Sequence, residues 1–145
     1  MKKYELTEET KVISGKTLFR IRALRSFGDI KAGDLGGFIE NERNLSHGGN
    51  AWVGDNAQVG GNAEVYGDAR VDGDAWVGGY ARVNGDGLIN SNNDYLCEQG
   101  LGSRNRSASF FKCKDGHIHV LCGCFSGNLD EFENKVKEEH GNSKY

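Results

Sequence analysis

Apolar and polar positions alternate with a six-residue period between Gly49 and Asn90. Alanine occupies every sixth position and valine follows two residues later, at Ala51, Ala57, Ala63, Ala69, Ala75, Ala81 and Val53, Val59, Val65, Val71, Val77, Val83. Residues two positions apart project to the same side of an extended strand. A period of six therefore predicts two strand residues and a corner in each unit, and it argues against an amphipathic helix here.

Glycines mark the corner of each predicted unit, because glycine takes positive φ without steric cost. Units such as Val53-Gly54-Asp55-Asn56-Ala57-Gln58 and the following Val59-Gly60-Gly61-Asn62-Ala63-Glu64 resemble the hexapeptide repeat of left-handed parallel β-helices. The resemblance implies three units per coil and a homotrimer. The expected fold class is mainly β, with a short left-handed parallel β-helix of about 2–3 coils, an N-terminal β-hairpin element and a C-terminal ββα element.

Three domains are expected: an N-terminal β element over 1–35, the β-helix over 36–90 and the ββα element over 91–145. With three units per coil, residues eighteen apart stack. The predicted outward stacks are Trp52 over Arg70 over Leu88, Gln58 over Trp76, and Glu64 over Arg82. Two outward tryptophans, Trp52 and Trp76, are candidates for an oligomer interface, and scattered surface aromatics are the alternative.

The N-terminal segment predicts a hairpin, with extended runs on either side of Ser14-Gly15. Arg20 and Arg22 lie on one face of the second strand, and with Arg25 they form a candidate anion-binding row. A solvated strand face is the alternative. Ile39 and Leu45 continue the six-residue register back from Ala51, so an irregular first coil is expected to begin near residue 35.

The C-terminal segment predicts a hairpin and a helix. Alternating runs at 107–112 and 117–122 flank an Asp-Gly turn, which is a strong hairpin signal. Asn128 is followed three positions later by Glu131, an arrangement typical of a helix N-terminus.

The whole order of parts resembles an uncharacterised group of hexapeptide-repeat proteins from bacteriophages and prophages. The residues that carry this resemblance are Tyr4-Glu5-Leu6-Thr7, Arg20-Ile21-Arg22-Ala23-Leu24, Gly33-Asp34-Leu35-Gly36-Gly37-Phe38-Ile39-Glu40 and Cys122-Gly123-Cys124-Phe125 with its helix. The resemblance implies a cytoplasmic location in the bacterial host cell, and it supplies no agreed activity.

Charge and hydropathy narrow the partner classes. The net charge is −3, and residues 49–90 carry six acids and two bases, a difference of −4. This distribution disfavours nucleic acid as a partner. No long apolar run is present, so no membrane span is expected. Polar residues follow Met-Lys-Lys, so a secretory signal is not expected either.

Two kinds of chemistry have candidate residues. Acyl transfer, the best-known enzymatic use of hexapeptide-repeat proteins, needs a histidine base, and His47 at the start of the repeats is the one candidate. Cys113, Cys122 and Cys124 are weak zinc candidates, with a disulfide or ordinary buried thiols as alternatives. No metal or other cofactor is expected.

The loop before the C-terminal hairpin is the preferred ligand site. Ser103, Arg104, Asn105 and Arg106 supply guanidinium, amide and hydroxyl groups that suit a phosphate or carboxylate, and a solvated connector is the alternative. We expect a non-enzymatic, homotrimeric, phage-type binding protein, with counter-defence as the leading function. Its partner is expected to be a host protein or an anionic small molecule such as a nucleotide. A structural role in a phage particle and a hexapeptide-repeat acyltransferase are the alternatives.

Overall fold

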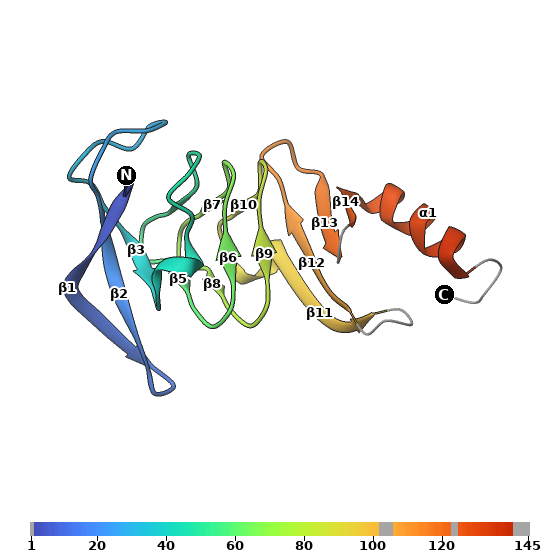
Figure 1. Cartoon of the computed structure of the whole chain (residues 1–145), viewed down its shortest axis with the longest axis horizontal. Helices are drawn as coiled ribbons and strands as arrows, with labels where there is room; N and C mark the ends of the chain where they lie inside the picture. Colours follow the sequence, from blue (N-terminus) through green and yellow to red (C-terminus); the bar gives the residue numbers. More distant parts are fainter. Residues whose placement is uncertain (1, 102–105, 123–124, 141–145) are drawn as a thin grey trace.

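The computed structural model describes residues 2–101, 106–122 and 125–140 of the 145-residue chain. The described chain is mainly β, and Figure 1 shows it as an elongated molecule. A hairpin of β1 (Tyr4–Ile13) and β2 (Lys16–Ala23) lies at one end. Very short strands occupy the middle, and a second sheet followed by helix α1 (Leu129–His140) forms the other end.

The middle of the chain consists of two-residue strands that pair in parallel. These are β4 (Trp52–Val53), β5 (Gln58–Val59), β6 (Glu64–Val65), β7 (Arg70–Val71), β8 (Trp76–Val77), β9 (Arg82–Val83) and β10 (Leu88–Ile89). They form three rows, β4–β7–β10, β5–β8 and β6–β9, in which each residue pairs with the residue eighteen positions later. The predicted register of the outward stacks is therefore confirmed.

The expected fold class requires correction. Four small sheets of mixed orientation and one helix make up the described chain, and a left-handed β-helix is not shown. The largest sheet, β1-β2-β3-β5-β8, joins antiparallel neighbours at β1, β2 and β3 (Leu35–Ile39) to parallel neighbours beyond β3. The two-residue strands of one row do not pair with those of another row, and flanking segments add longer strands such as β3.

The expected inward positions are confirmed. Every alanine and valine of the repeat is buried, and all but Val83 have no exposed surface. Burial of apolar surface contributes about 25 cal/mol per Å², so these side chains supply the main stabilising contacts of the middle segment. Trp52 joins this core and is 1% exposed, because Phe27 and Tyr4 pack edge-on against its ring.

The corners have one repeated backbone conformation. Positive φ angles recur every six residues, at Asp55, Gly61, Gly67, Gly73, Gly79 and Gly85. At Gly67 a Cβ atom would lie 2.8 Å from the backbone nitrogen of Gly85. Close stacking of successive corners therefore requires glycine here, in addition to its tolerance of positive φ.

The segment before β4 stacks on the repeats with a different offset from that between the repeats themselves. Ile39 pairs with Val59 and Leu45 forms a bridge with Val65, so both residues stand twenty positions before their partners. The expectation that they continue the alanine register is thus wrong. They take valine-type positions, and the longer chain between Leu45 and Val53 absorbs the two extra residues.

Side chains complete the backbone ladder at its N-terminal side. The carbonyl of Ala57 accepts a hydrogen bond from the backbone of Phe38. The equivalent carbonyl of Ala51 accepts from the Lys3 ammonium at 2.6 Å, and that of Ala63 accepts from the Asn44 amide at 2.8 Å. Both side chains are fully buried. Buried carbonyls need partners, so Lys3 and Asn44 supply donors to the two carbonyls that receive no N–H from the described backbone.

Side chains also complete the ladder at its C-terminal side. The N–H of Trp76 donates to the Asn92 side chain at 2.7 Å, and the N–H of Arg82 donates to the Ser109 hydroxyl at 2.8 Å. The Tyr95 hydroxyl donates to the carbonyl of Trp76. These contacts cover strand edges that would otherwise be open to pairing with another chain.

The C-terminal element is larger than the expected ββα unit. It is an antiparallel sheet of β11 (Tyr95–Leu101), β12 (Arg106–Lys112), β13 (Ile118–Cys122) and β14 (Phe125–Asn128), followed by α1. The predicted hairpin is present as β12–β13. The predicted helix start is also confirmed, since Asn128 and Glu131 each accept a hydrogen bond from the other's backbone N–H.

The sheet lies between the repeats and the helix. Phe111 is buried where it contacts Gly87 of the last repeat, and Phe110 packs edge-on against Phe132 of α1. A hairpin alone would leave β12 and β13 each with an open edge, and β11 and β14 cover these edges. Among the helices formed by the described residues, none is long and apolar enough to cross a membrane.

Replacement of Asn44 tests the side-chain part of the ladder. Asn44→Ala removes the donor to Ala63 and the acceptor for the N–H groups of Glu40 and Asn41. We expect the free energy of unfolding to fall by about 3 kcal/mol, because buried groups are left without partners. Asn62→Ala, at an exposed turn position, should change it by less than about 0.5 kcal/mol. Equal losses in denaturant titrations of the two variants would contradict the proposed role of Asn44.

Replacement of Lys3 tests its buried ammonium. Burial, with a smaller effect of Arg25, lowers the pKa of Lys3 from 10.5 to about 8. The folded protein then releases this proton at lower pH than the unfolded chain, so stability should rise with pH above 8. Between about pH 7.5 and 9.5 the unfolding free energy of the wild type should gain about 2 kcal/mol relative to Lys3→Met. Parallel pH profiles of the two proteins would contradict a shifted Lys3.

Candidate functional site

An acidic hollow lies on the outer side of the row β4–β7–β10. It has a volume of about 530 Å³, and its charged and amide lining groups are Asp29, Asn50, Asp68, Arg70, Asp72 and Lys114. Gly28 and Leu88 complete the lining. We call this feature the acidic hollow.

The eighteen-residue offset builds most of the acidic hollow. Trp52, Arg70 and Leu88 form the outward line of the row. The same offset aligns Asn50 with Asp68 before the strands, where the Asn50 N–H donates to the Asp68 carboxylate at 3.2 Å. Polar side chains from separate repeats thus gather at one place without any longer chain excursion.

Asp72 leans over the chain segment that lies eighteen residues earlier. A Cβ atom at Gly54, eighteen residues earlier, would collide with the Asp72 carboxylate, so glycine is needed there for this carboxylate to reach the acidic hollow. Burial raises the pKa of Asp72, and its ion pair with Arg70 opposes that shift.

Arg70 is the central group of the acidic hollow. Its guanidinium forms ion pairs with Asp29 at 2.9 Å and with Asp72 at 3.1 Å. Asp29 comes from the connection between β2 and β3, so Arg70 joins the N-terminal element to the repeats. The Nε of Arg70 is buried and has no hydrogen-bond partner in the described part of the chain.

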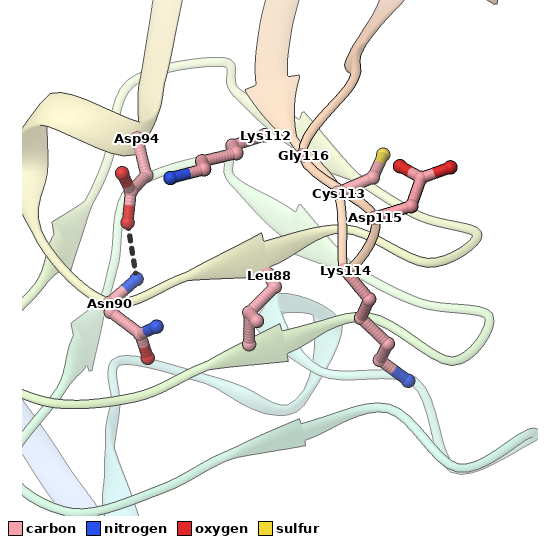
Figure 2. Close-up of a pocket in the computed structure, with 8 residues that line it drawn as sticks. All are labelled: Leu88, Asn90, Asp94, Lys112, Cys113, Lys114, Asp115 and Gly116. Atoms are coloured by element: carbon pink, nitrogen blue, oxygen red, sulfur yellow. Dashed lines mark hydrogen bonds between the residues drawn. The ribbon is translucent and has the colours of Figure 1, made fainter.

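A second hollow adjoins the first at the C-terminal turn. It has a volume of about 300 Å³ and is lined by Asn90, Asp94, Leu88 and the segment 112–116. Figure 2 shows Lys112 and Asp94 facing each other across it, with the Asp94 carboxylate bonded to the N–H of Asn90. We call this feature the turn hollow. Leu88 and Lys114 line both hollows.

Arg20 and Arg22, two of the predicted ligand-binding residues, contact acidic residues of their own chain. Arg20 forms an ion pair with Glu9 at 2.9 Å, donates to the carbonyl of Gly36 and lies over the ring of Phe38. Arg22 forms an ion pair with Glu5. The charges of Arg20 and Arg22 are therefore largely neutralised by the hairpin itself, and an anion would have to compete with these contacts.

The other predicted ligand-binding residues cannot be placed. Ser103, Arg104 and Asn105 lie outside the described residues, and for Arg106 only the backbone, at the start of β12, is described. The loop prediction therefore stays a prediction.

The two tryptophans differ in exposure. Trp76 is 44% exposed and stays a candidate for an oligomer interface. Trp52 is buried under the N-terminal element, so the expectation that both are exposed is wrong for Trp52. The covering ring of Phe27 lies twenty-five residues earlier in the sequence, outside the repeat pattern.

His47 contacts other residues of the chain through both ring nitrogens and one ring face. Its Nδ1 accepts a hydrogen bond from the N–H of Lys3 at 3.0 Å, and its Nε2 lies 2.9 Å from the Glu42 carboxylate. The ring stacks on Tyr4 at 4.1 Å. The hydrogen bond to His47 is the main cause that lowers the pKa of Glu42. With both ring nitrogens in use, His47 lacks the free lone pair that a general base needs.

The two zinc candidates that the structure describes, Cys113 and Cys122, lie on opposite faces of the sheet. Cys113 continues the face of β12 that carries Ser109 and Phe111, whereas Cys122 pairs with Ala108 on the opposite face. Burial raises the pKa of Cys113, which favours its thiol form. Cys124 lies outside the described residues. Across the described ranges, no group of three His, Cys, Asp or Glu residues could hold a metal ion.

Part of the acidic hollow is detectable in the sequence. The offset of eighteen aligns Asn50 with Asp68 and Gly54 with Asp72, and it follows from the six-residue period together with the three units per coil that the resemblance implies. Asp29 and Lys114 come from outside the repeats, and no sequence signal indicates that they reach the same place.

Comparison with known proteins adds no family to these observations. No family model matches the chain, and no curated protein matches it.

Proposed function

We propose that the protein is a non-enzymatic binding protein whose acidic hollow takes a basic side chain from a partner protein. The observation that supports this proposal is the convergence of Asp29, Asp68 and Asp72 on one open hollow. Carboxylates there can accept charge-assisted hydrogen bonds from an ammonium or a guanidinium group.

The charge balance of the acidic hollow favours a cation. Three carboxylates face two cationic side chains. Arg70 already contacts Asp29 and Asp72, so its charge is shared between two acids. Asp68 contacts only a backbone N–H among the bonds described here, which leaves acceptor capacity for a ligand. An anion entering the acidic hollow would meet a net negative lining.

The shape of the acidic hollow favours a side chain presented by a protein surface. Asp29 has an 82% exposed side chain and Asp68 is also exposed, so the carboxylates stand at an open rim. Half-buried Leu88 adds apolar surface beside them. Lysine and arginine combine a charged end with an apolar stem, which matches exposed carboxylates beside the apolar side chain of Leu88.

The wider expectations stay predictions. Counter-defence in the cytoplasm of an infected bacterial cell, by a homotrimer that blocks a host protein, stays a prediction, and the acidic hollow bears only on its protein-partner part. Sequestration of a nucleotide depends mainly on residues 103–106, of which 103–105 lie outside the described residues and Arg106 is described by its backbone alone. The roles as a particle component and as an acyltransferase have no specific observation in their favour.

Binding of a basic probe tests the proposal. We expect a fluorescent hexa-arginine peptide to bind the wild type at low ionic strength. The double variant Asp68→Asn, Asp72→Asn should bind it about five- to tenfold more weakly, since exposed ion pairs contribute about 0.2–1 kcal/mol each. The matched control is Glu64→Gln, Asp74→Asn, which removes the same charge at exposed positions outside the acidic hollow.

Fluorescence anisotropy gives the affinities, and thermal unfolding checks that both variants fold. The control should change the affinity less than about twofold. No binding by the wild type, or equal weakening in the two double variants, would reject the acidic hollow as the binding site.

A further inference from the structure

Lys114 occupies an unusual position between the two hollows. Its backbone N–H donates to the carbonyl of Asp86 at 2.9 Å, and the neighbouring Cys113 forms a bridge with Gly87. These bonds fix the Lys114 Cα beside the last repeat. The side chain is exposed and lines the acidic hollow as well as the turn hollow.

Lys114 and Leu88 both line the two hollows. Figure 2 shows the Lys114 ammonium directed away from the neighbouring Asp115 and away from Asp94. Asp115 instead contacts His117, whose backbone and ring hydrogen bonds lower the pKa of that carboxyl. Lys114 is thus the one cationic side chain of the turn hollow that also reaches the lining of the acidic hollow, among the described residues.

The ammonium of Lys114 is held loosely. Among the ion pairs between described residues, none includes Lys114, whereas Arg70 has two. A flexible, hydrated ammonium near exposed carboxylates gains little from any single geometry. The ammonium therefore offsets part of the negative charge of the acidic hollow, and it can leave the hollow at little cost in free energy.

We infer that Lys114 is an internal competitor, which occupies the acidic hollow in the free protein and leaves when a basic side chain of the partner enters. This inference rests on the proposed function. It also names the preferred ligand group: a guanidinium, which can form two parallel hydrogen bonds with a carboxylate, displaces Lys114 more readily than a second ammonium does.

Two matched variants test this role. Lys114→Met and Lys112→Met remove the same charge from neighbouring exposed positions, but only Lys114 lines the acidic hollow. We expect Lys114→Met to bind hexa-arginine about two- to fivefold more tightly than the wild type. Hexa-lysine should gain by the same factor, because displacing Lys114 costs the same free energy whichever ligand enters, so the preference for arginine should not change. Lys112→Met should change either affinity less than about twofold.

The outcomes separate the two proposals. If the wild type binds hexa-arginine and both variants gain equally, or Lys114→Met gains nothing, the competitor role is wrong while the acidic hollow stands. If neither the wild type nor Lys114→Met binds the peptide, the proposed function and this inference both fail.

Discussion

Backbone hydrogen bonds between segments eighteen residues apart are the constraint on which the rest of this structure depends. They turn a sequence of two-residue strands into three rows, and they direct every alanine and valine of the repeat inward. A ladder of this kind leaves unpaired carbonyls at one side and unpaired N–H groups at the other. The chain supplies Lys3 and Asn44 for the first and Asn92 and Ser109 for the second.

The acidic hollow is a consequence of the same offset. Because residues eighteen apart stand side by side, Asp68 accepts a hydrogen bond from Asn50, and Gly54 leaves the space that the Asp72 carboxylate fills. Arg70 then links this face to Asp29 of the N-terminal element. Lys114 arrives from the other end of the chain, since its backbone is bonded to the last repeat. A rigid row and two flanking elements are thus enough to assemble a charged site.

The sequence predicts the periodic part of the molecule better than its ends. The inward residues follow from the period, and the stacking register follows from the period and the three units per coil that the resemblance implies. The C-terminal hairpin and helix start follow from local turn and capping chemistry. The predicted fold class, a left-handed β-helix, is wrong because periodicity does not reveal the added antiparallel strands, such as β11 and β14. The pairing of these strands is decided by open sheet edges. Burial of Trp52 and the contribution of Asp29 depend on long-range packing, which no local pattern encodes.

Amide hydrogen exchange measured by NMR tests the ladder most directly. We expect the N–H groups of Trp52, Gln58 and Glu64, which donate to carbonyls seventeen residues later, to exchange only through opening of the whole middle segment. The N–H groups of Trp76 and Arg82, which donate to side chains, should be protected to a similar degree. Exchange of all five at the rate of exposed turn amides would contradict the ladder and the site built on it.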